Sequence, residues 1–421
     1  MHIVLLNNYF PPEIGAASHL YYDLGVELTR RNYKVTVLTG TPRYNVSPEI
    51  IITYEKNGKK YYIENLDGLN IIRVKLPIVD KHKKIRRGIE HFEIAWKLLK
   101  GGKALLREKV DAILVYSPPL TLGITAVKLS KHVNAPVIFN VQDLFPKEAI
   151  DVGLIKNKIV INYFKHLEKT IYNRVDLITV HSSKNKKYVS EIVRSDEKVV
   201  VVENWLDISK IVPGPKENAF SKKHALTKQF IVSFAGTLGH FQDVEVIIKA
   251  AYLLKETKNI LFIIVGDGIR KSEAKRLIDK FNLKNVMLLE TVPRNVYPDV
   301  LRSSDISLAT LNKDLKTPVV PSKILSIMSA GIPVIATMNL DGDAPKLIER
   351  AKAGYALPAG DAKGLAEKIL ELYNNPDLRK KLGKNGREYV EKNLSVQVAA
   401  DKYEEIFKKV IKEYKRRNKH G

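Results

Sequence analysis

The sequence has 421 residues, a length that suits two domains of roughly 200 residues better than one. Its 70 Lys and Arg against 46 Asp and Glu leave a net charge of +24. Such a balance favours a polyanionic neighbour, namely nucleic acid, an anionic membrane surface or phosphorylated substrates, unless the lysines only form a solvated surface. The absence of cysteine excludes disulfides, thiolate zinc sites and a cysteine nucleophile.

The chain contains no stretch of about 18 uncharged apolar residues, so we predict no transmembrane helix. Its opening letters, MHIVLLNN, lack the basic and long apolar regions of a signal peptide and predict a first strand. We therefore expect a cytoplasmic protein, with peripheral attachment to the inner face of the cell membrane left open. The richness in Lys, Ile and Val is a hint of a thermophilic source.

Strand-like and helix-like segments alternate from the first residues onward. A strand over His2–Leu6 precedes a helix over 17–30 with Leu20, Leu24 and Leu28 on one face, and residues 34–39 then alternate as a second strand. This order is typical of a parallel sheet. Further strands are predicted at Ile71–Lys75, Ala112–Tyr116, Pro136–Val141, Leu177–Val180 and Val199–Val202.

The same pattern starts again after residue 205. The Pro- and Gly-bearing stretch IVPGPKENAFSKKH, residues 211–224, is the predicted linker. A helix is predicted over Asp243–Glu256. Strands are predicted at Gln229–Ala235, Asn259–Val265, Val286–Leu289, Ile306–Ala309 and Pro333–Ala336. We expect α/β domains over 1–205 and 206–395, both Rossmann-like, with a helix over 396–421 packing back. Their ligand site should lie at carboxyl ends of strands, in a cleft between the domains.

Each predicted domain begins with a strand that runs into a small-residue loop. In the first domain, Gly15 and Ala16 precede a helix whose free N–H groups could bind an anion or a sugar hydroxyl, although small residues there are also ordinary turn chemistry. In the second, Gly236, Thr237 and Gly239 follow a strand, the context in which backbone amides bind diphosphate. Neither a P-loop nor the full GxGxxG fingerprint is present.

Two further motifs belong to the second domain. Gly266, Asp267 and Gly268 close the next strand as a tight turn. Ser322 is predicted to cap a helix, which places Lys323 in its first turn, where the helix dipole disfavours a cation. An anionic ligand would remove that conflict; the alternative is a plain surface lysine.

Taken together, these segments resemble family-four glycosyltransferases, in particular the branch that includes fucosamine and colanic-acid fucosyl transferases. The resemblance rests on NNYFPPEIGAASHLYYDLGVELTRRNYKVTVLTG, YSPPL, VQDLFPKEAI, FAGTLGHFQDVEVIIKAA, IVGDG, PSKILSIMSAGIPVIA and AGYALPAGDAKGLAEKI, which run in family order over nearly the whole chain. It implies a GT-B fold, with two Rossmann-like domains facing across a cleft. It also implies a reaction that needs no metal or other cofactor and retains the anomeric configuration.

The resemblance also assigns roles. Gly15 matches the loop near the transferred sugar, with Ala16 and Glu13 beside it, and Asp143 matches an acidic residue on the acceptor-side domain. The diphosphate loop and the nucleotide turn fall on Gly236, Gly239, Gly266 and Gly268, and the PSK motif on Ser322 and Lys323.

Several positions depart from the family pattern. Gln142 replaces a common His, Thr237 and Gln242 replace a common Arg and Lys, and the usual pair of Glu residues falls on Pro318 and Ser326. The neutralisation of the diphosphate therefore shifts to Lys323, with Arg294 as a second candidate. Same-face attack assisted by the leaving phosphate is the expected route, with Asp143 as an alternative base; Glu148 is a further carboxylate of that loop.

The stretch KHKKIRRGIEHFEIAWKLLKGGKALLREK combines charge with an apolar stripe of helical spacing, formed by Ile85, Ile89, Phe92, Trp96 and Leu99. Its basic residues Lys81, Lys83, Lys84, Arg86 and Arg87 could contact anionic lipid near a polyprenyl-linked acceptor. Alternatively, the stripe covers the first sheet.

The predicted reaction moves a sugar from a nucleotide diphosphate, UDP first and GDP second, to a lipid-linked or other glycan acceptor in surface polysaccharide or glycoprotein assembly. A nucleotide-sugar 2-epimerase of the same fold is the alternative. A nucleic-acid partner is not expected, because the sequence has no RNP motif, zinc-finger spacing or basic-region zipper.

Overall fold

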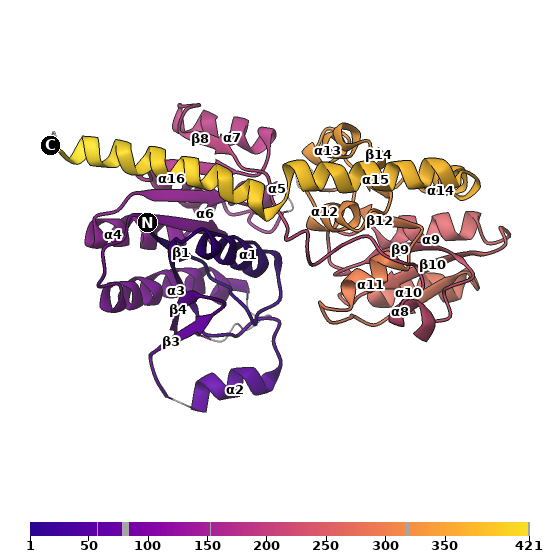
Figure 1. The fold of residues 1–421 in the computed structure, drawn as a ribbon, viewed down its shortest axis with the longest axis horizontal. Helices are drawn as coiled ribbons and strands as arrows, with labels where there is room; N and C mark the ends of the chain where they lie inside the picture. Colours follow the sequence, from indigo (N-terminus) through magenta and orange to yellow (C-terminus); the bar gives the residue numbers. More distant parts are fainter. Residues whose placement is uncertain (57, 78–83, 152, 316–319, 420–421) are drawn as a thin grey trace. The chain divides into compact units, whose positions relative to one another are not determined.

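The computed structural model describes residues 1–56, 58–77, 84–151, 153–315 and 320–419, without the side chains of 84–89 and 419. The chain divides into two compact units, shown in Figure 1. Unit 1 comprises Met1–Trp205 and Val396–Gly421, and unit 2 comprises Leu206–Ser395. Unit 2 is thus inserted into the sequence of unit 1.

Unit 1 is built on an eight-stranded sheet of order β3-β4-β2-β1-β5-β6-β7-β8. Neighbouring strands are parallel except β3 and β4, which are antiparallel. The strands are β1 His2–Leu6, β2 Lys34–Gly40, β3 Tyr61–Leu66, β4 Leu69–Val74, β5 Ala112–Ser117, β6 Val137–Val141, β7 Leu177–Val180 and β8 Val199–Val201. The edge strand β3 was not predicted, because its polar sequence YYIENL gives no clear alternation.

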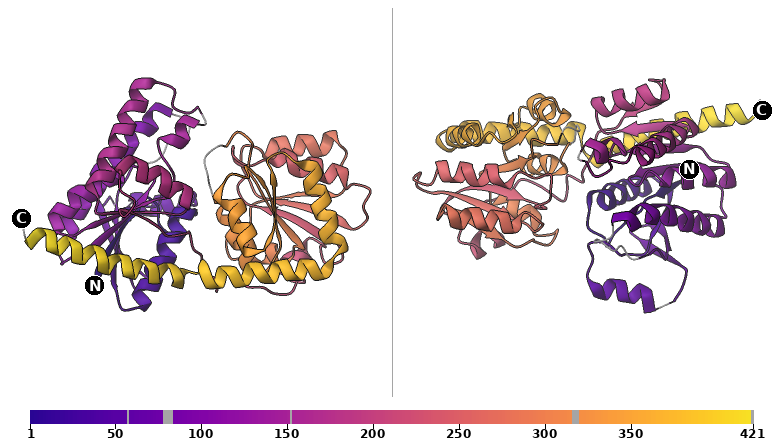
Figure 2. Two further views of the ribbon diagram at one scale, coloured as in Figure 1. Left: turned by 90° about the horizontal axis from the view of Figure 1, so that it is seen from above. Right: turned by 180° about the vertical axis from the view of Figure 1, so that it is seen from behind.

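Helices cover both faces of this sheet, as Figure 2 shows. Alternate residues of β1 point to opposite faces: Val4 and Leu6 join a core with α3, α4 and α6, whereas Ile3 and Leu5 join a core with α1 and α16. The helices are α1 Ala16–Arg30, α2 Pro48–Lys56, α3 Lys84–Leu105, α4 Leu122–Val133, α5 Lys147–Asp151, α6 Lys158–Arg174, α7 Ser183–Val193 and α16 Val396–Lys419. The carboxyl ends of the parallel strands therefore stay open at one edge.

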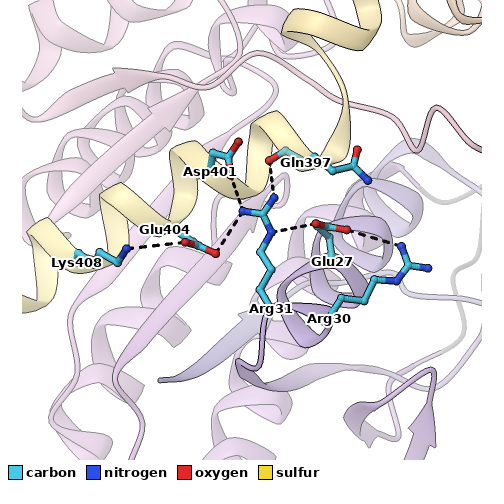
Figure 3. A network of polar contacts seen from close by, with 7 residues as sticks. All are labelled: Glu27, Arg30, Arg31, Gln397, Asp401, Glu404 and Lys408. Atoms are coloured by element: carbon cyan, nitrogen blue, oxygen red, sulfur yellow. Dashed lines mark hydrogen bonds and ion pairs between the residues drawn. The ribbon is translucent and has the colours of Figure 1, made fainter.

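The chain returns to unit 1 through α16, which packs beside α1. Tyr403 is fully buried there, and its ring lies 5.6 Å from that of Trp205. Figure 3 shows how Arg31 at the end of α1 donates to Asp401 at 2.6 Å and to the carbonyl of Gln397 at 3.1 Å. An apolar stripe and a multiply bonded arginine thus hold α16 to unit 1.

Unit 2 has a six-stranded, fully parallel sheet of order β11-β10-β9-β12-β13-β14. Its strands are β9 Phe230–Ala235, β10 Ile260–Val265, β11 Val286–Leu289, β12 Ile306–Thr310, β13 Val334–Met338 and β14 Gly354–Pro358. Its helices are α8 Ala219–Lys223, α9 Val244–Leu253, α10 Lys271–Lys280, α11 Tyr297–Arg302, α12 Ser322–Ser329, α13 Asp343–Ala351, α14 Ala362–Asn374 and α15 Pro376–Asn393. This arrangement is Rossmann-like, as predicted.

The prediction of a linker over 211–224 was wrong. Lys216 donates through Nζ to the carbonyl of Gln229 at 2.6 Å, and Asn218 caps α8 by accepting from the amide of Ser221 at 3.0 Å. Proline and glycine here shape a turn-rich segment that packs into unit 2, and turn chemistry alone does not distinguish such a segment from a free linker.

The predicted apolar stripe of α3 is only partly turned inward. Trp96 is exposed, Phe92 and Leu99 are half-buried, and the fully buried face consists instead of Ile94 and Leu98. The side chains of 84–89 and all of residues 78–83 lie outside the described part of the chain, so most of the predicted basic cluster does too. Among the described residues, no helix is both long and apolar enough to cross a membrane.

Candidate active site

In unit 2, the loops after β9 and β10 lie against each other at the carboxyl edge of the sheet. The amide of Leu238 donates to the carbonyl of Asp267 at 2.8 Å, and the amide of Arg270 donates to that of Leu238 at 3.0 Å. A Cβ atom at Gly266 would lie 2.0 Å from the carbonyl oxygen of Gly236, so only glycine allows this approach. The two predicted glycine turns therefore form one continuous backbone surface.

Lys323 reaches this surface from the first turn of α12. Its Nζ lies 3.8 Å from the centroid of the Phe234 ring, and a Cβ atom at Gly236 would lie 3.3 Å from it. The Nζ atom is buried and has no hydrogen-bond partner among the described residues. Desolvation lowers the pKa of Lys323 to about 7. A buried ammonium beside a glycine turn is therefore prepared for an anion that the protein itself does not supply.

The loop after β9 is held by one of its own side chains. The amide of Gly239 donates to Oε1 of Gln242 at 3.1 Å, so an amide predicted to bind diphosphate already has an acceptor. Thr237 is exposed in the same loop. The neutral amide of Gln242 thus orders the turn.

Ser322 does not cap α12, contrary to the prediction. Pro321 occupies the N-cap position with an extended backbone, and the helix begins at Ser322, whose side chain is exposed and makes no cap hydrogen bond. The helix therefore starts one residue earlier than expected, with the fixed φ of Pro321 immediately before its first turn. The first N–H groups of α12 are thus left without a side-chain cap.

One turn further along α12 lies Ser326, one of the two positions on which the glutamate pair of the family pattern was expected to fall. It hydrogen-bonds Tyr297, whose pKa is raised to about 12, mainly by burial. The sequence analysis missed Tyr297, because nothing in the spacing of residues 297 and 326 indicates that they meet. Pro318, the other position of the glutamate pair, lies outside the described residues.

The remaining predicted residues of unit 2 lie in exposed loops. Asp267 lies after β10, and one of its carboxylate oxygens is 3.9 Å from Nζ of Lys271. Arg294 is exposed in the connection between β11 and α11. Neither is as enclosed as Lys323.

In unit 1, a pair of carboxyl groups follows β6. The side chain of Asp143 is exposed on one side, and the protein atoms crowded around it partly desolvate its carboxyl group, which raises its pKa to about 6. Glu148 of α5 accepts from the amide of Leu144 at 3.0 Å, which fixes the loop next to Asp143. Burial, followed by the charge of Asp143, raises the pKa of Glu148 to about 7. The pair therefore titrates near neutral pH and can hold or release a proton.

Gln142, the residue before Asp143, points into the protein. It is 5% exposed, and its Nε2 donates to Oδ1 of Asn140 at 2.9 Å. Asn140 in turn donates to the hydroxyls of Thr179 and Tyr403. We therefore assign Gln142 to a buried polar chain that supports the loop.

The loop after β1 is fixed by Glu13 and leaves Gly15 open. The Glu13 carboxylate accepts from the amides of Phe10, Arg43 and Tyr44, all at 3.1 Å, and is 1% exposed. Burial is the largest cause of the raised pKa of Glu13. A Cβ atom at Gly15 would meet no atom within 4 Å, and Ala16 is exposed. Glu13 thus orders the loop, whereas Gly15 and Ala16 offer accessible backbone.

No group of three or more His, Asp or Glu side chains within the described ranges could hold a metal ion. The two sheet edges instead offer an anion site around Lys323 and a proton-holding pair at Asp143 and Glu148.

Comparison with known proteins agrees with the division of the chain into two units. Residues 15–210 match the model of the Glycosyltransferase Family 4, and residues 215–389 match that of the Glycosyl transferases group 1. The probable glycosyltransferase WbjE of Pseudomonas aeruginosa is 25% identical over 81% of this chain and 85% of its own. The putative colanic acid biosynthesis glycosyl transferase WcaI of Escherichia coli is 21% identical over 83% of this chain and 86% of its own.

Solved structures show the same fold. Anabaena HepE in complex with UDP has a TM-score of 0.70 at 15% identity, covering 97% of this chain and 100% of that one. WaaG, a glycosyltransferase involved in lipopolysaccharide biosynthesis, has a TM-score of 0.66 at 16% identity; the match covers 97% of this chain and 99% of that one. The fold and its matches thus define an enzyme that transfers a sugar.

More particularly, the chain is a glycosyltransferase of the GT-B fold whose residues 15–210 match the family-four model, and the prediction of fold class and enzyme class is confirmed.

Proposed function

We propose that the chain moves a sugar from a UDP-sugar to a lipid-linked or other glycan acceptor in surface polysaccharide or glycoprotein assembly, with retention at the anomeric carbon. HepE, a structural neighbour, was solved with UDP, and a relative is named for colanic acid biosynthesis. The match to WcaI also supports assignment to the branch with fucosamine and colanic-acid fucosyl transferases. Unit 2 binds the donor in this proposal, and unit 1 binds the acceptor.

The observation that carries the donor assignment is the buried, unpartnered ammonium of Lys323 beside Gly236. A departing nucleotide diphosphate gains negative charge as the bond to the sugar breaks. Preorganised cations and amides stabilise such charge most effectively where water is excluded. Lys323, the amides of the loop after β9 and the uncapped first turn of α12 fit this requirement.

For the transfer step, the acceptor oxygen bonds to the anomeric carbon on the face from which the diphosphate leaves. The bond between that carbon and the diphosphate oxygen breaks, and the leaving phosphate takes the acceptor proton. Asp143 accepts a hydrogen bond from the acceptor hydroxyl and orients it, for which an ionised carboxylate is required. Its pKa of about 6 leaves it mostly ionised at neutral pH.

The test measures thermal unfolding of the full chain in the presence of UDP, GDP or ADP. A ligand at 100 times its dissociation constant adds about 2.7 kcal/mol to the free energy of unfolding. We expect the largest shift with UDP, its loss in Lys323→Met, and its retention in the control Lys346→Gln, which alters an exposed lysine of α13. Equal shifts in wild type and Lys323→Met would contradict the donor site.

Product analysis then separates transfer from epimerisation. None of the relatives named above is an epimerase, so that alternative gains no support from them. A 2-epimer formed from the UDP-sugar without acceptor would nevertheless establish it.

A further inference from the structure

Two helices of unit 1 expose large apolar side chains around a shared aromatic contact. The rings of Phe92 on α3 and Tyr163 on α6 lie 6.2 Å apart between centroids. We define the α3–α6 surface as Phe92, Trp96, Leu154, Ile159, Val160 and Tyr163, all on these helices or in the turn before α6. Through the contact between Phe92 and Tyr163, the patch joins two segments that are far apart in sequence.

These side chains are not needed to fill the core. Ile159 is 79% exposed, Leu154 69%, Trp96 53% and Tyr163 52%. The same helices bury other residues: Ile94 and Leu98 on α3, and Ile171 and Tyr172 on α6. Each helix therefore presents one apolar face to the core and a second one to the outside. Contiguous exposed apolar side chains of this kind mark a contact with another molecule or with a membrane.

The surroundings of the patch are basic. Lys158, Lys165 and Lys169 are exposed on α6, and their spacing of seven and four residues places them in one row beside Ile159 and Tyr163. The only carboxylate in the α6 sequence, Glu168, is buried.

On α3, Nζ of Lys100 lies 3.6 Å from the centroid of the Trp96 ring. Glu93 on the same helix is neutralised by Lys97 at 2.8 Å. Apart from the Glu93–Lys97 pair, the exposed charges named here on α3 and α6 are therefore lysines.

We infer that the α3–α6 surface docks on a lipid bilayer that contains anionic lipids. Tryptophan and tyrosine favour the boundary between headgroups and acyl chains, and lysines keep their ammonium groups in the headgroup layer while their stems cover apolar surface. Protein–protein interfaces are instead depleted of lysine, which speaks against a protein partner. The inference adds a membrane contact to the proposed transfer onto a lipid-linked acceptor. It rests on the proposed function only for the biological purpose of that contact, because the residues that support it all belong to unit 1.

The test is flotation of the full chain with phosphatidylcholine vesicles, with and without phosphatidylglycerol. The charge variant combines Lys158→Gln, Lys165→Gln and Lys169→Gln. We expect about a fivefold loss of partitioning per lysine, and about a hundredfold in all, with anionic vesicles only. The matched control changes three exposed lysines of unit 2 to Gln, namely Lys275, Lys346 and Lys363, and should bind as the wild type does.

The apolar variant combines Trp96→Ser, Ile159→Ser and Tyr163→Ser. It should lose vesicle binding, and a change of salt concentration should not restore that binding. Its control is Tyr252→Ser with Leu253→Ser on α9, a second exposed pair with a lysine over the tyrosine ring. All variants are checked for wild-type thermal unfolding, so that loss of binding is not loss of fold.

Three outcomes would overturn the inference. The first is absence of wild-type binding to anionic vesicles, and the second is an equal loss of binding in the variants and their controls. The third is a wild-type dimer in light scattering that the apolar variant dissociates, since a second copy would then cover the surface. UDP-induced stabilisation is measured on the same samples: if UDP fails to bind while vesicles bind, the proposed function fails and the membrane surface stands.

Discussion

The sheet edges of the two units carry opposite charges, yet burial acts on both in the same way. In unit 1 it raises the pKa of Asp143 to about 6 and of Glu148 to about 7, and in unit 2 it lowers that of Lys323 to about 7. Removal from water disfavours the charged form whatever its sign. Each edge therefore holds groups poised near neutral pH.

The edges differ in how completely the protein satisfies these groups. Glu148 accepts a backbone hydrogen bond from Leu144, and Asp143 remains open to solvent. Lys323 has a buried Nζ that makes no hydrogen bond within the described part of the chain. The comparison teaches that unit 2 carries an uncompensated charge that a ligand must complete, whereas unit 1 carries a pair suited to proton exchange.

Lys323→Met should have the largest effect. The loss of a buried cation at the leaving group should lower kcat/KM by roughly 10² to 10³. Without donor, the variant should unfold at a higher temperature than the wild type, because a desolvated ammonium is removed. Since the pKa of Lys323 is lowered from 10.5 to about 7 on folding, this stability gain is complete below pH about 7 and disappears as the pH approaches 10.5. Calorimetry across this range checks it, and a destabilised variant would contradict it.

Asp143→Asn should have the second largest effect, with kcat lowered by a factor of about 10² and the affinity for UDP unchanged. The amide keeps the size of the side chain but accepts a hydrogen bond less strongly than a carboxylate. Steady-state kinetics with UDP titration separates the two quantities. Full activity would remove Asp143 from the reaction.

The pH dependence of UDP binding should show the charge of Lys323 directly. Affinity should fall by up to about tenfold per pH unit above 7, because the free protein then has to take up a proton to pair with the diphosphate. Calorimetric titration in buffers of different ionisation enthalpy measures that uptake. In Lys323→Met both the proton uptake and this slope should vanish; a slope that persists would assign the proton to another group.

Glu148→Gln should have the smallest effect. Its amide oxygen can still accept from Leu144, and Glu148 is still protonated and neutral when Asp143 ionises, so the pKa of Asp143 should stay at about 6. The acidic limb of the pH–rate profile should therefore keep its position, with a change of no more than about threefold in maximal rate. A limb that moves to lower pH would mean that the charge of Glu148 helps to raise the pKa of Asp143.

The sequence predicted most of the parallel strands, because buried strands such as Ile260–Val265 are nearly continuous apolar runs. The strands β3 and β14 were missed: the first is polar, and Gly354–Pro358 begins and ends in residues typical of turns. The pairing of Tyr297 with Ser326, and the burial of Lys323 against Phe234, depend on contacts between separate segments. Local patterns do not contain that information.

The insertion of unit 2 also sets an order of assembly during synthesis. The chain enters unit 2 at Leu206 and leaves it at Ser395, and these two residues form a parallel bridge. Unit 2 is thus one uninterrupted stretch that can fold as soon as it leaves the ribosome. Unit 1 begins to emerge first yet stays incomplete, with Tyr21 and Trp205 lacking the cover of Tyr403, until the residues after 395 have been made. Unit 1 is therefore the last to become competent, and a chain interrupted within unit 2 would leave it unfinished.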